Sequence, residues 1–228
     1  MNISLTFMST FRGREYAMNL GEPIASGNTA NIYLHENKVI KIFKDHLPDT
    51  ESENEARKQK VAFESGLRVP KILDIKKVNG QQAIIMEYVE GKTLGELVTE
   101  NMDEVESFLE MSVDIQMDIH KVLAEALEPM RIKLQRQIEA VKGLDELVKT
   151  SLLNKLHSMR VEKRLCHGDF HLYNMIKSGD EIFIIDWVDA SSGNPQADVC
   201  RTYILYSQVS LDIAELYLKL YCQYSGWS

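Results

Sequence analysis

A change of pattern near residue 88 constrains the fold of this chain more than any other feature of its sequence. Up to residue 87, short apolar runs such as Val39–Phe43 alternate with polar turns, a pattern typical of β-strands. From residue 88 onward, apolar residues recur mainly at helical spacing. We therefore expect two parts of unlike structure, residues 1–87 and residues 88–228.

The first part is predicted to form a small antiparallel sheet of five strands with one helix. Asn79-Gly80 separates two of the strand patterns, and this dipeptide favours the positive backbone angles of a tight hairpin turn. The helical pattern follows the break at Pro48 and stops at Gly66. The expected elements are strands within residues 19–43, 72–78 and 82–87 and a helix over residues 51–63.

The second part is predicted to be mostly helical, which makes the whole chain an α+β protein. A polar loop at residues 166–174 and a short apolar strand at residues 182–185 interrupt the helical pattern. Helices are expected over residues 102–126, 131–159 and 198–222.

Composition limits the partners of the chain. Its 228 residues include 26 Lys and Arg against 34 Asp and Glu, a formal net charge of −8. A surface of that sign repels nucleic-acid phosphates and anionic lipids, so neither partner is expected. The charge mildly permits a cationic small molecule. Oligomeric state is not predicted.

The sequence also indicates a cytoplasmic location. The N-terminal residues lack the basic start and continuous apolar stretch of a secretory signal, and no run reaches the roughly 18 apolar residues of a membrane span. The three cysteines form no C-x-x-C pair and are odd in number, which favours a reducing compartment.

Hard oxygen ligands gather in one polar loop and at the end of the strand that follows. Asp169 and Asn174 lie five residues apart in the loop, and Asp186 ends an apolar strand, where an unpartnered carboxylate would be costly. Mg²⁺ would supply that partner. One carboxylate and one amide on Mg²⁺, with a second carboxylate free to orient a hydroxyl, suit phosphoryl transfer from ATP.

This segment resembles the signature of the aminoglycoside phosphotransferase and choline kinase family. The family's H-G-D-x-x-x-x-N matches residues 167–174, I-D-W matches residues 185–187, and G-x-P-x-x-D matches residues 193–198. The resemblance covers residues 19–225 and implies a protein-kinase-like fold of two lobes. It further implies that Asp169 is the catalytic base, that Asn174 and Asp186 hold Mg²⁺, and that His167 braces the loop.

Lys41 is the expected phosphate anchor. It shares a strand face with Val39 and Phe43, and a lysine among apolar neighbours needs an anion; kinase-like folds pair it with nucleotide phosphates and a helix glutamate. Two glutamates compete for that role. A capping box from Thr50 would engage Glu53 and leave Glu55 free, whereas a cap at Ser52 would reverse this choice; the family pattern favours Glu55.

Two further segments are expected to contact the nucleotide. The turn Ser26-Gly27-Asn28-Thr29 is close to the family's S-G-x-T turn, and its backbone N–H groups could approach phosphate oxygens. The resemblance also makes residues 86–91 the hinge that binds adenine through the backbones of Glu87 and Val89.

The resemblance implies an ATP-dependent phosphotransferase that moves the γ-phosphoryl group to a hydroxyl of a small molecule, with ATP and Mg²⁺. The acceptor class stays open among aminoglycosides, amino alcohols and sugars. Alternatives are a catalytically silent nucleotide-binding regulator, a protein kinase, and a metal-dependent hydrolase built on His167, Asp169 and His171. Relatives continue with further helices, so we expect a more open pocket or a truncated chain.

Overall fold

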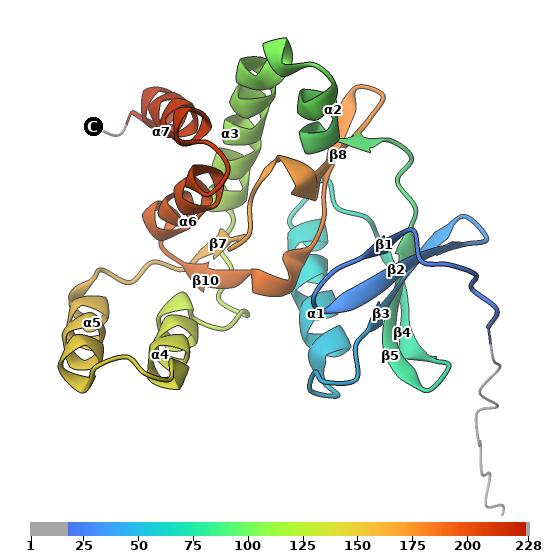
Figure 1. Ribbon diagram of the computed structural model, residues 1–228, viewed down its shortest axis with the longest axis horizontal. Coiled ribbons are helices and arrows are strands. Elements are labelled where there is room, and N and C mark those ends of the chain that lie inside the picture. Colours follow the sequence, from blue (N-terminus) through green and yellow to red (C-terminus); the bar gives the residue numbers. More distant parts are fainter. Residues whose placement is uncertain (1–17, 227–228) are drawn as a thin grey trace, which may run out of the picture.

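The computed structural model of the chain describes residues 18–226, and the expectation about the N-terminal residues falls outside this range. Figure 1 shows a sheet with one helix on the right and a larger helical part on the left. This is the expected α+β, kinase-like fold of two lobes. Among the described residues, no helix combines the length and the apolar character required to cross a membrane.

The first lobe is an antiparallel five-stranded sheet in the order β1-β2-β3-β5-β4, packed against helix α1. The hairpin between β4 and β5 turns at Asn79 and Gly80, both with positive φ, as predicted. The elements are β1 (Ala25–Ser26), β2 (Ala30–His35), β3 (Lys38–Phe43), α1 (Glu51–Glu64), β4 (Ile72–Val78) and β5 (Gln81–Glu87).

The two faces of this sheet follow from the period-two alternation of β3. Phe43 packs with Ala56 of α1, whereas Ile40 and Ile42 belong to a separate apolar cluster on the other face, to which Met18 is packed. Lys41 therefore points toward α1, as the alternation predicted.

The second lobe holds six α-helices and short strand pairs among the described residues. Its core lies between α3, α6, α7 and β7, and includes Leu109, Ile119 and Tyr217. The helices are α2 (Leu94–Glu100), α3 (Val105–Lys121), α4 (Met130–Ala140), α5 (Glu146–Ser158), α6 (Pro195–Ser207) and α7 (Leu211–Ser225). The strands are β6 (Lys92–Thr93), β7 (Arg164–Cys166), β8 (Met175–Ser178), β9 (Glu181–Ile184) and β10 (Ser191–Gly193).

Three predicted helix ranges were wrong in extent. The helix predicted over residues 102–126 ends at Lys121, because the backbone of Val122 is extended and Leu123 pairs with Arg164 at the start of β7. The second is broken into α4 and α5 around Gly143, whose φ is +82°. The third begins at Pro195 and is broken between α6 and α7 after Ser207. In the second lobe, β6, β7, β8 and β10 were not predicted, because their two to four residues are too few to show a periodicity, whereas β9 was recognised as an apolar run.

Strand pairing brings the loop of residues 166–174 next to the end of β9. Strand β8 pairs with β9 and β6, while β10 pairs with β7. In Figure 1, α4 and α5 lie side by side at the lower left, and α4 contacts β10.

Candidate active site

The lysine of β3 lies at the junction of three elements. Lys41 is 6% exposed, and its Nζ lies 2.6 Å from Oε1 of Glu55 in α1 and 2.9 Å from Oδ1 of Asp186. Strands β2 and β5 flank it through Ile32 and Ile84. One cation thus joins the sheet, its helix and the segment that follows β9.

Helix packing decides which glutamate meets Lys41. Glu55 is 1% exposed and faces the sheet, whereas Glu53 is exposed to solvent. Neither capping box considered for this helix is present: Thr50 makes no side-chain cap, and the N–H of Ser52 donates to Gln82 Oε1 instead. The position of Glu55 on the buried face is therefore what selects it.

Electrostatics keep Lys41 charged. Burial opposes the charge, but Glu55 and then Asp186 attract it, so that the pKa of Lys41 is raised above its ordinary value. A buried ammonium that stays charged is suited to hold an anion such as a polyphosphate.

A strained backbone position directs the carboxylate of Asp186. Its φ and ψ are 61° and 68°, in the left-handed region that few residues other than Gly, Asn and Asp adopt. The preceding residue donates its N–H to the carbonyl of Asn174 at 3.0 Å. This bond brings the two predicted Mg²⁺ ligands next to each other.

Asn174 and Asp169 interact within the polar loop. The Asn174 Nδ2 donates to the main-chain oxygen of Asp169 at 2.8 Å and to its Oδ2 at 3.3 Å. The Oδ1 of Asn174 is left as a ligand atom. His171 Nε2 lies 3.5 Å from Asp169 Oδ2, and hydrogen bonding to His171 lowers the pKa of Asp169, although burial opposes this effect. Asp169 is therefore a carboxylate at neutral pH.

His167 has the bracing role that the resemblance implied. Its Nε2 bonds to the Ile185 carbonyl at 3.1 Å, and its Nδ1 accepts the N–H of Asp169 at 3.3 Å. Complete burial lowers its pKa, so the ring is neutral. Its ring centroid lies 4.7 Å from that of Trp187. Both ring nitrogens are occupied, which leaves none for a metal and removes support from the hydrolase alternative.

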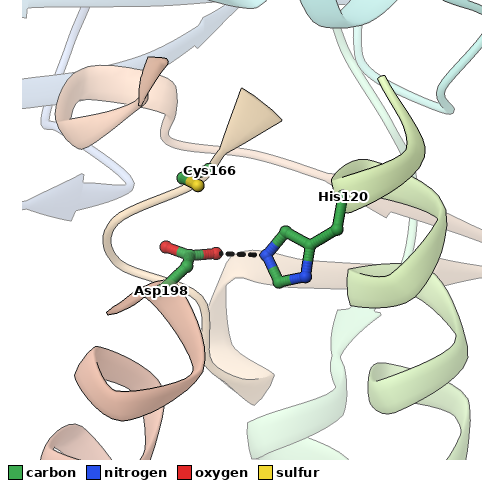
Figure 2. Close-up of side chains that lie close together, drawn as sticks. All are labelled: His120, Cys166 and Asp198. Carbon is green, nitrogen blue, oxygen red and sulfur yellow. Dashed lines mark hydrogen bonds and ion pairs between the residues drawn. The ribbon is translucent and has the colours of Figure 1, made fainter. Parts of the chain in front are cut away.

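Asp198, in the first turn of α6, anchors the polar loop through hydrogen bonds to its backbone. Its Oδ1 accepts the N–H of Gly168 at 2.7 Å, and its Oδ2 accepts the N–H of His167 at 3.3 Å and lies 3.0 Å from His120 Nε2. Figure 2 shows His120 pointing at Asp198 from α3. Burial is the largest single influence and opposes the ionisation of Asp198, but the interactions with His120, His167 and the Gly168 N–H together outweigh it, so the pKa of Asp198 is lowered.

The side chains in Figure 2 include Cys166, and His120, Cys166 and Asp198 bring possible metal-ligand atoms within 4.8 Å of one another. His120 has no spare nitrogen, because its Nδ1 bonds to the Tyr221 hydroxyl at 2.8 Å. Burial raises the pKa of the Cys166 thiol, so it stays protonated, whereas a metal ligand must be a thiolate. We assign this cluster a structural role.

The turn between β1 and β2 offers fewer donors than its sequence suggests. The N–H of Gly27 donates to the Ala30 carbonyl at 2.9 Å, and the Ser26 hydroxyl donates to Asn31 Oδ1 at 2.7 Å. This leaves the N–H groups of Asn28 and Thr29 for phosphate oxygens.

The two expected hinge residues lie at the end of β5 and just after it: Glu87 is the last residue of β5. The N–H of Glu87 donates to the Lys71 carbonyl at 3.0 Å. The backbone of Glu87 therefore has only its carbonyl oxygen available for a nucleotide base. Val89 follows the end of β5 and precedes β6.

Sequence comparison assigns the chain to a family. The model of the Phosphotransferase enzyme family matches residues 21–228. The chain belongs to this family. It is thus a small-molecule phosphotransferase, and the resemblance drawn from residues 167–174 and 185–187 is confirmed. No curated protein sequence matches the chain.

Solved structures of aminoglycoside phosphotransferases share the fold of this family member. A thermostable mutant of APH(4)-Ia in its apo form has a TM-score of 0.64 at 16% identity, covering 88% of this chain and 77% of that one. The ADP-bound APH(2'')-Ib has a TM-score of 0.60 at 19% identity, with 88% and 76% covered. The gentamicin complex of APH(2'')-IIa has a TM-score of 0.63 at 19% identity, with 88% and 75% covered.

Gly168 is a residue of this phosphotransferase that the motif contained but whose role only the structure explains. Its φ is +81°, and a Cβ at this position would lie 2.5 Å from the Asp189 main-chain oxygen. Any side chain would therefore push Asp169 away from residues 187–189.

We expect Gly168→Ala to lower the melting temperature and the catalytic rate together. The strain and the clash should cost about 1–3 kcal/mol, because neither the left-handed backbone nor the contact can relax without moving the loop. Gly179→Ala is the matched control, since Gly179 also has positive φ but nothing lies within 4 Å of its added Cβ. Calorimetry and rate measurements on both variants check this. Equal activity of the two would show that the contact with Asp189 does not matter.

Proposed function

We propose that this chain transfers the γ-phosphoryl group of ATP to a hydroxyl of a small molecule. One observation carries the proposal: Lys41 Nζ contacts both Glu55 and Asp186, so a strand lysine, a helix carboxylate and the aspartate after β9 converge. The hydrogen bond from Ile185 to Asn174 brings the loop that contains Asp169 to the same place. Phosphoryl transfer requires such positioning and charge neutralisation rather than covalent chemistry by the protein.

Each residue has a role in this proposal. Lys41 binds the phosphates, and Glu55 holds its ammonium in position. Asp169, kept ionised by its surroundings, accepts the proton of the acceptor hydroxyl as that oxygen attacks the γ-phosphorus in line. Main-chain N–H groups of Asn28 and Thr29 would cover the phosphates, and the Glu87 carbonyl with the Val89 backbone would receive the adenine.

The donor set suits Mg²⁺. Oδ1 of Asp186 accepts a hydrogen bond from Lys41, and its Oδ2 has no hydrogen bond or ion pair among the described residues. Asn174 bonds through its Nδ2, so its Oδ1 is available as a metal ligand. These are hard oxygen donors with no nitrogen or sulfur among them, which is the ligand type that Mg²⁺ prefers. When bound, Mg²⁺ would neutralise phosphate charge. Asn174 and Asp186 would hold it.

Related structures support a nucleotide and a hydroxyl acceptor. A mutant APH(4)-Ia forms a ternary complex with AMP-PNP and hygromycin B, and APH(2'')-Ib is described bound to ADP. We propose by analogy that residues 1–87 bind the nucleotide and that residues 88–228 bind the acceptor. The cytoplasmic location remains a proposal from the composition. A silent nucleotide-binding regulator is the second candidate, which a turnover measurement distinguishes.

Calorimetric titration with Mg·ATP tests the nucleotide site. Asp186→Asn is expected to weaken binding about 10- to 100-fold, because a charged ligand to phosphate-bound Mg²⁺ and to Lys41 is lost. Asp180→Asn, an equal change of charge at an exposed residue on the turn between β8 and β9, should bind as the wild type does.

Release of ADP is then followed over a panel of hydroxyl compounds. Turnover that depends on an added acceptor would support the kinase, and binding without turnover over the whole panel would favour the regulator. If folded wild-type protein fails to bind Mg·ATP at all, the proposed function is wrong.

A further inference from the structure

A small cavity opens beside the catalytic loop, on the side away from the sheet. It has a volume of about 260 Å³ and is lined by residues of α4, β10, α6 and the loop around Gly168. Gly168 precedes Asp169 directly, and Nη2 of Arg201, another lining residue, lies 3.9 Å from Asp169 Oδ1. A molecule in this cavity therefore lies next to the proposed catalytic base. The volume is just below the range of about 300–1,000 Å³ that is usual for drug-sized ligands, so the occupant is small.

The carboxylates that line this cavity are already paired. Asp189 Oδ1 lies 2.6 Å from Nζ of Lys133, a residue of α4 that also donates to the Asp189 main-chain oxygen. Asp198 is 1% exposed, and its oxygens are taken by the two loop N–H groups and by His120. Among the described residues, Oδ2 of Asp189 has no hydrogen bond or ion pair, whereas Asp198 is buried with both of its oxygens bonded.

One cation of the cavity has donors to spare. Arg201 projects from α6 and its side chain is 48% exposed. Its Nε donates to the Gly168 carbonyl at 3.3 Å, and only Nη2 approaches a carboxylate, at the 3.9 Å given above. A guanidinium has five N–H donors in a planar fork that matches a carboxylate or a phosphate. Several of these donors are therefore available at the mouth of the cavity.

Further positive charge lies behind the same segment. Lys58 of α1 donates its Nζ hydrogen to the Val188 carbonyl, next to Asp189. Burial and then the charge of Lys133 lower the pKa of Lys58, so these two ammonium groups repel each other. The surroundings of residues 188–189 thus hold two lysines, with Arg201 across the cavity. Among the lining residues, Lys133 and Arg201 balance Asp189 and Asp198, so the lining has no net charge, whereas the whole chain carries −8.

We infer that the phosphoryl acceptor of this enzyme is a small hydroxyl compound with an anionic group, a carboxylate or a phosphate, bound by Arg201 and assisted by Lys133. The inference rests on the proposed function. It opposes the permissive interpretation of the net charge, because the unused hydrogen-bond donors at this cavity belong to a guanidinium and the lining has no net negative charge. A cationic amino alcohol or aminoglycoside would face the half-exposed Arg201, and among these residues its ammonium groups could pair only with Asp169 and with Oδ2 of Asp189.

The test is acceptor-dependent ADP release by the full chain with Mg·ATP. The panel contains neutral compounds (glycerol, glucose), anionic ones (glycerate, glycerol 3-phosphate, sugar phosphates) and cationic ones (ethanolamine, choline, kanamycin). We expect turnover only among the anionic compounds. Comparing carboxylates with phosphates then identifies which anion is preferred.

Two matched variants then test the role of Arg201. Arg201→Gln should raise the KM for the active acceptor about 10- to 100-fold, the cost of losing charge-assisted hydrogen bonds, while the Kd for Mg·ATP stays within twofold. Arg136→Gln is the control, because Arg136 also belongs to this helical region but pairs with Glu128 and does not line the cavity. It should leave the KM unchanged.

The outcomes separate the two proposals. Turnover of a neutral or cationic compound in preference to every anionic one would overturn the anionic acceptor and leave the kinase intact. An unchanged acceptor KM in Arg201→Gln, or no turnover of any anionic compound by protein that binds Mg·ATP, would also overturn it. Absence of Mg·ATP binding would instead reject the proposed function itself.

Discussion

Asp169→Asn is expected to reduce the kcat of acceptor-dependent ADP release by about 10²- to 10⁴-fold, the usual contribution of a general base. Asparagine has nearly the shape of aspartate but cannot accept the proton of the attacking hydroxyl. The contacts of Asp169 to Asn174 and His171 are within the loop, and Lys41, Glu55 and Asp186 do not contact it. The Kd for Mg·ATP should therefore change little.

Titration calorimetry and steady-state rates on the same preparation measure these two effects separately. Asp180→Asn removes an equal charge from an exposed turn and should keep the wild-type kcat. Because the pKa of Asp169 is below its ordinary 3.8, its protonation should not reduce the wild-type rate between pH 8 and pH 5. A kcat for Asp169→Asn within tenfold of wild type would show that Asp169 is not the base.

Asp198→Asn is expected to destabilise the fold by about 3–5 kcal/mol, the cost of breaking a buried charged network on one side. The amide would turn an N–H₂ group toward donors of the loop or toward His120, since both carboxylate oxygens accept hydrogen bonds. For a chain of this size the melting temperature should fall by about 6–20 °C. Asp212→Asn, exposed in the first turn of α7, should lose less than about 1 kcal/mol.

The pH dependence of this loss follows from the lowered pKa of Asp198. A carboxyl group with a depressed pKa in the folded state stabilises that state above the unfolded pKa, and the contribution disappears as the pH falls through the folded value. The difference in unfolding free energy between wild type and Asp198→Asn should thus be constant from pH 7 to pH 5 and shrink only below about pH 4. Urea denaturation across this range measures it. A gap that already narrows at pH 6 would mean that Asp198 titrates near neutrality.

Local patterns in the sequence were sufficient to predict the chemistry of the chain. The loop with Asp169 and Asn174, the strand end at Asp186 and the strand lysine Lys41 could each be located, because spacing within one loop or strand determines which side chains share a face. The antiparallel sheet was predicted for the same reason: β2, β3, β4 and β5 are long enough to show alternation, and Asn79-Gly80 identifies a hairpin.

Other features depended on contacts between distant segments. Glu55 rather than Glu53 meets Lys41 because α1 packs one of its faces on the sheet, and the caps considered from the sequence are absent. The helices predicted across residues 131–159 and 198–222 were too long, since Gly143 and the residues after Ser207 end helices where the chain has to turn.

The sequence by itself determined the family, the fold class and the set of reactive residue types, because short motifs and local patterns of apolar residues are sufficient to recognise them. Only the tertiary structure decided how the catalytic loop is held and what charge the neighbouring cavity presents. Asp198 binds main-chain N–H groups 30 and 31 residues away in sequence, and the cavity combines Lys133 with Arg201 from two separate helices. No periodicity records such pairings, because they arise from the packing of whole elements rather than from the spacing of residues within one.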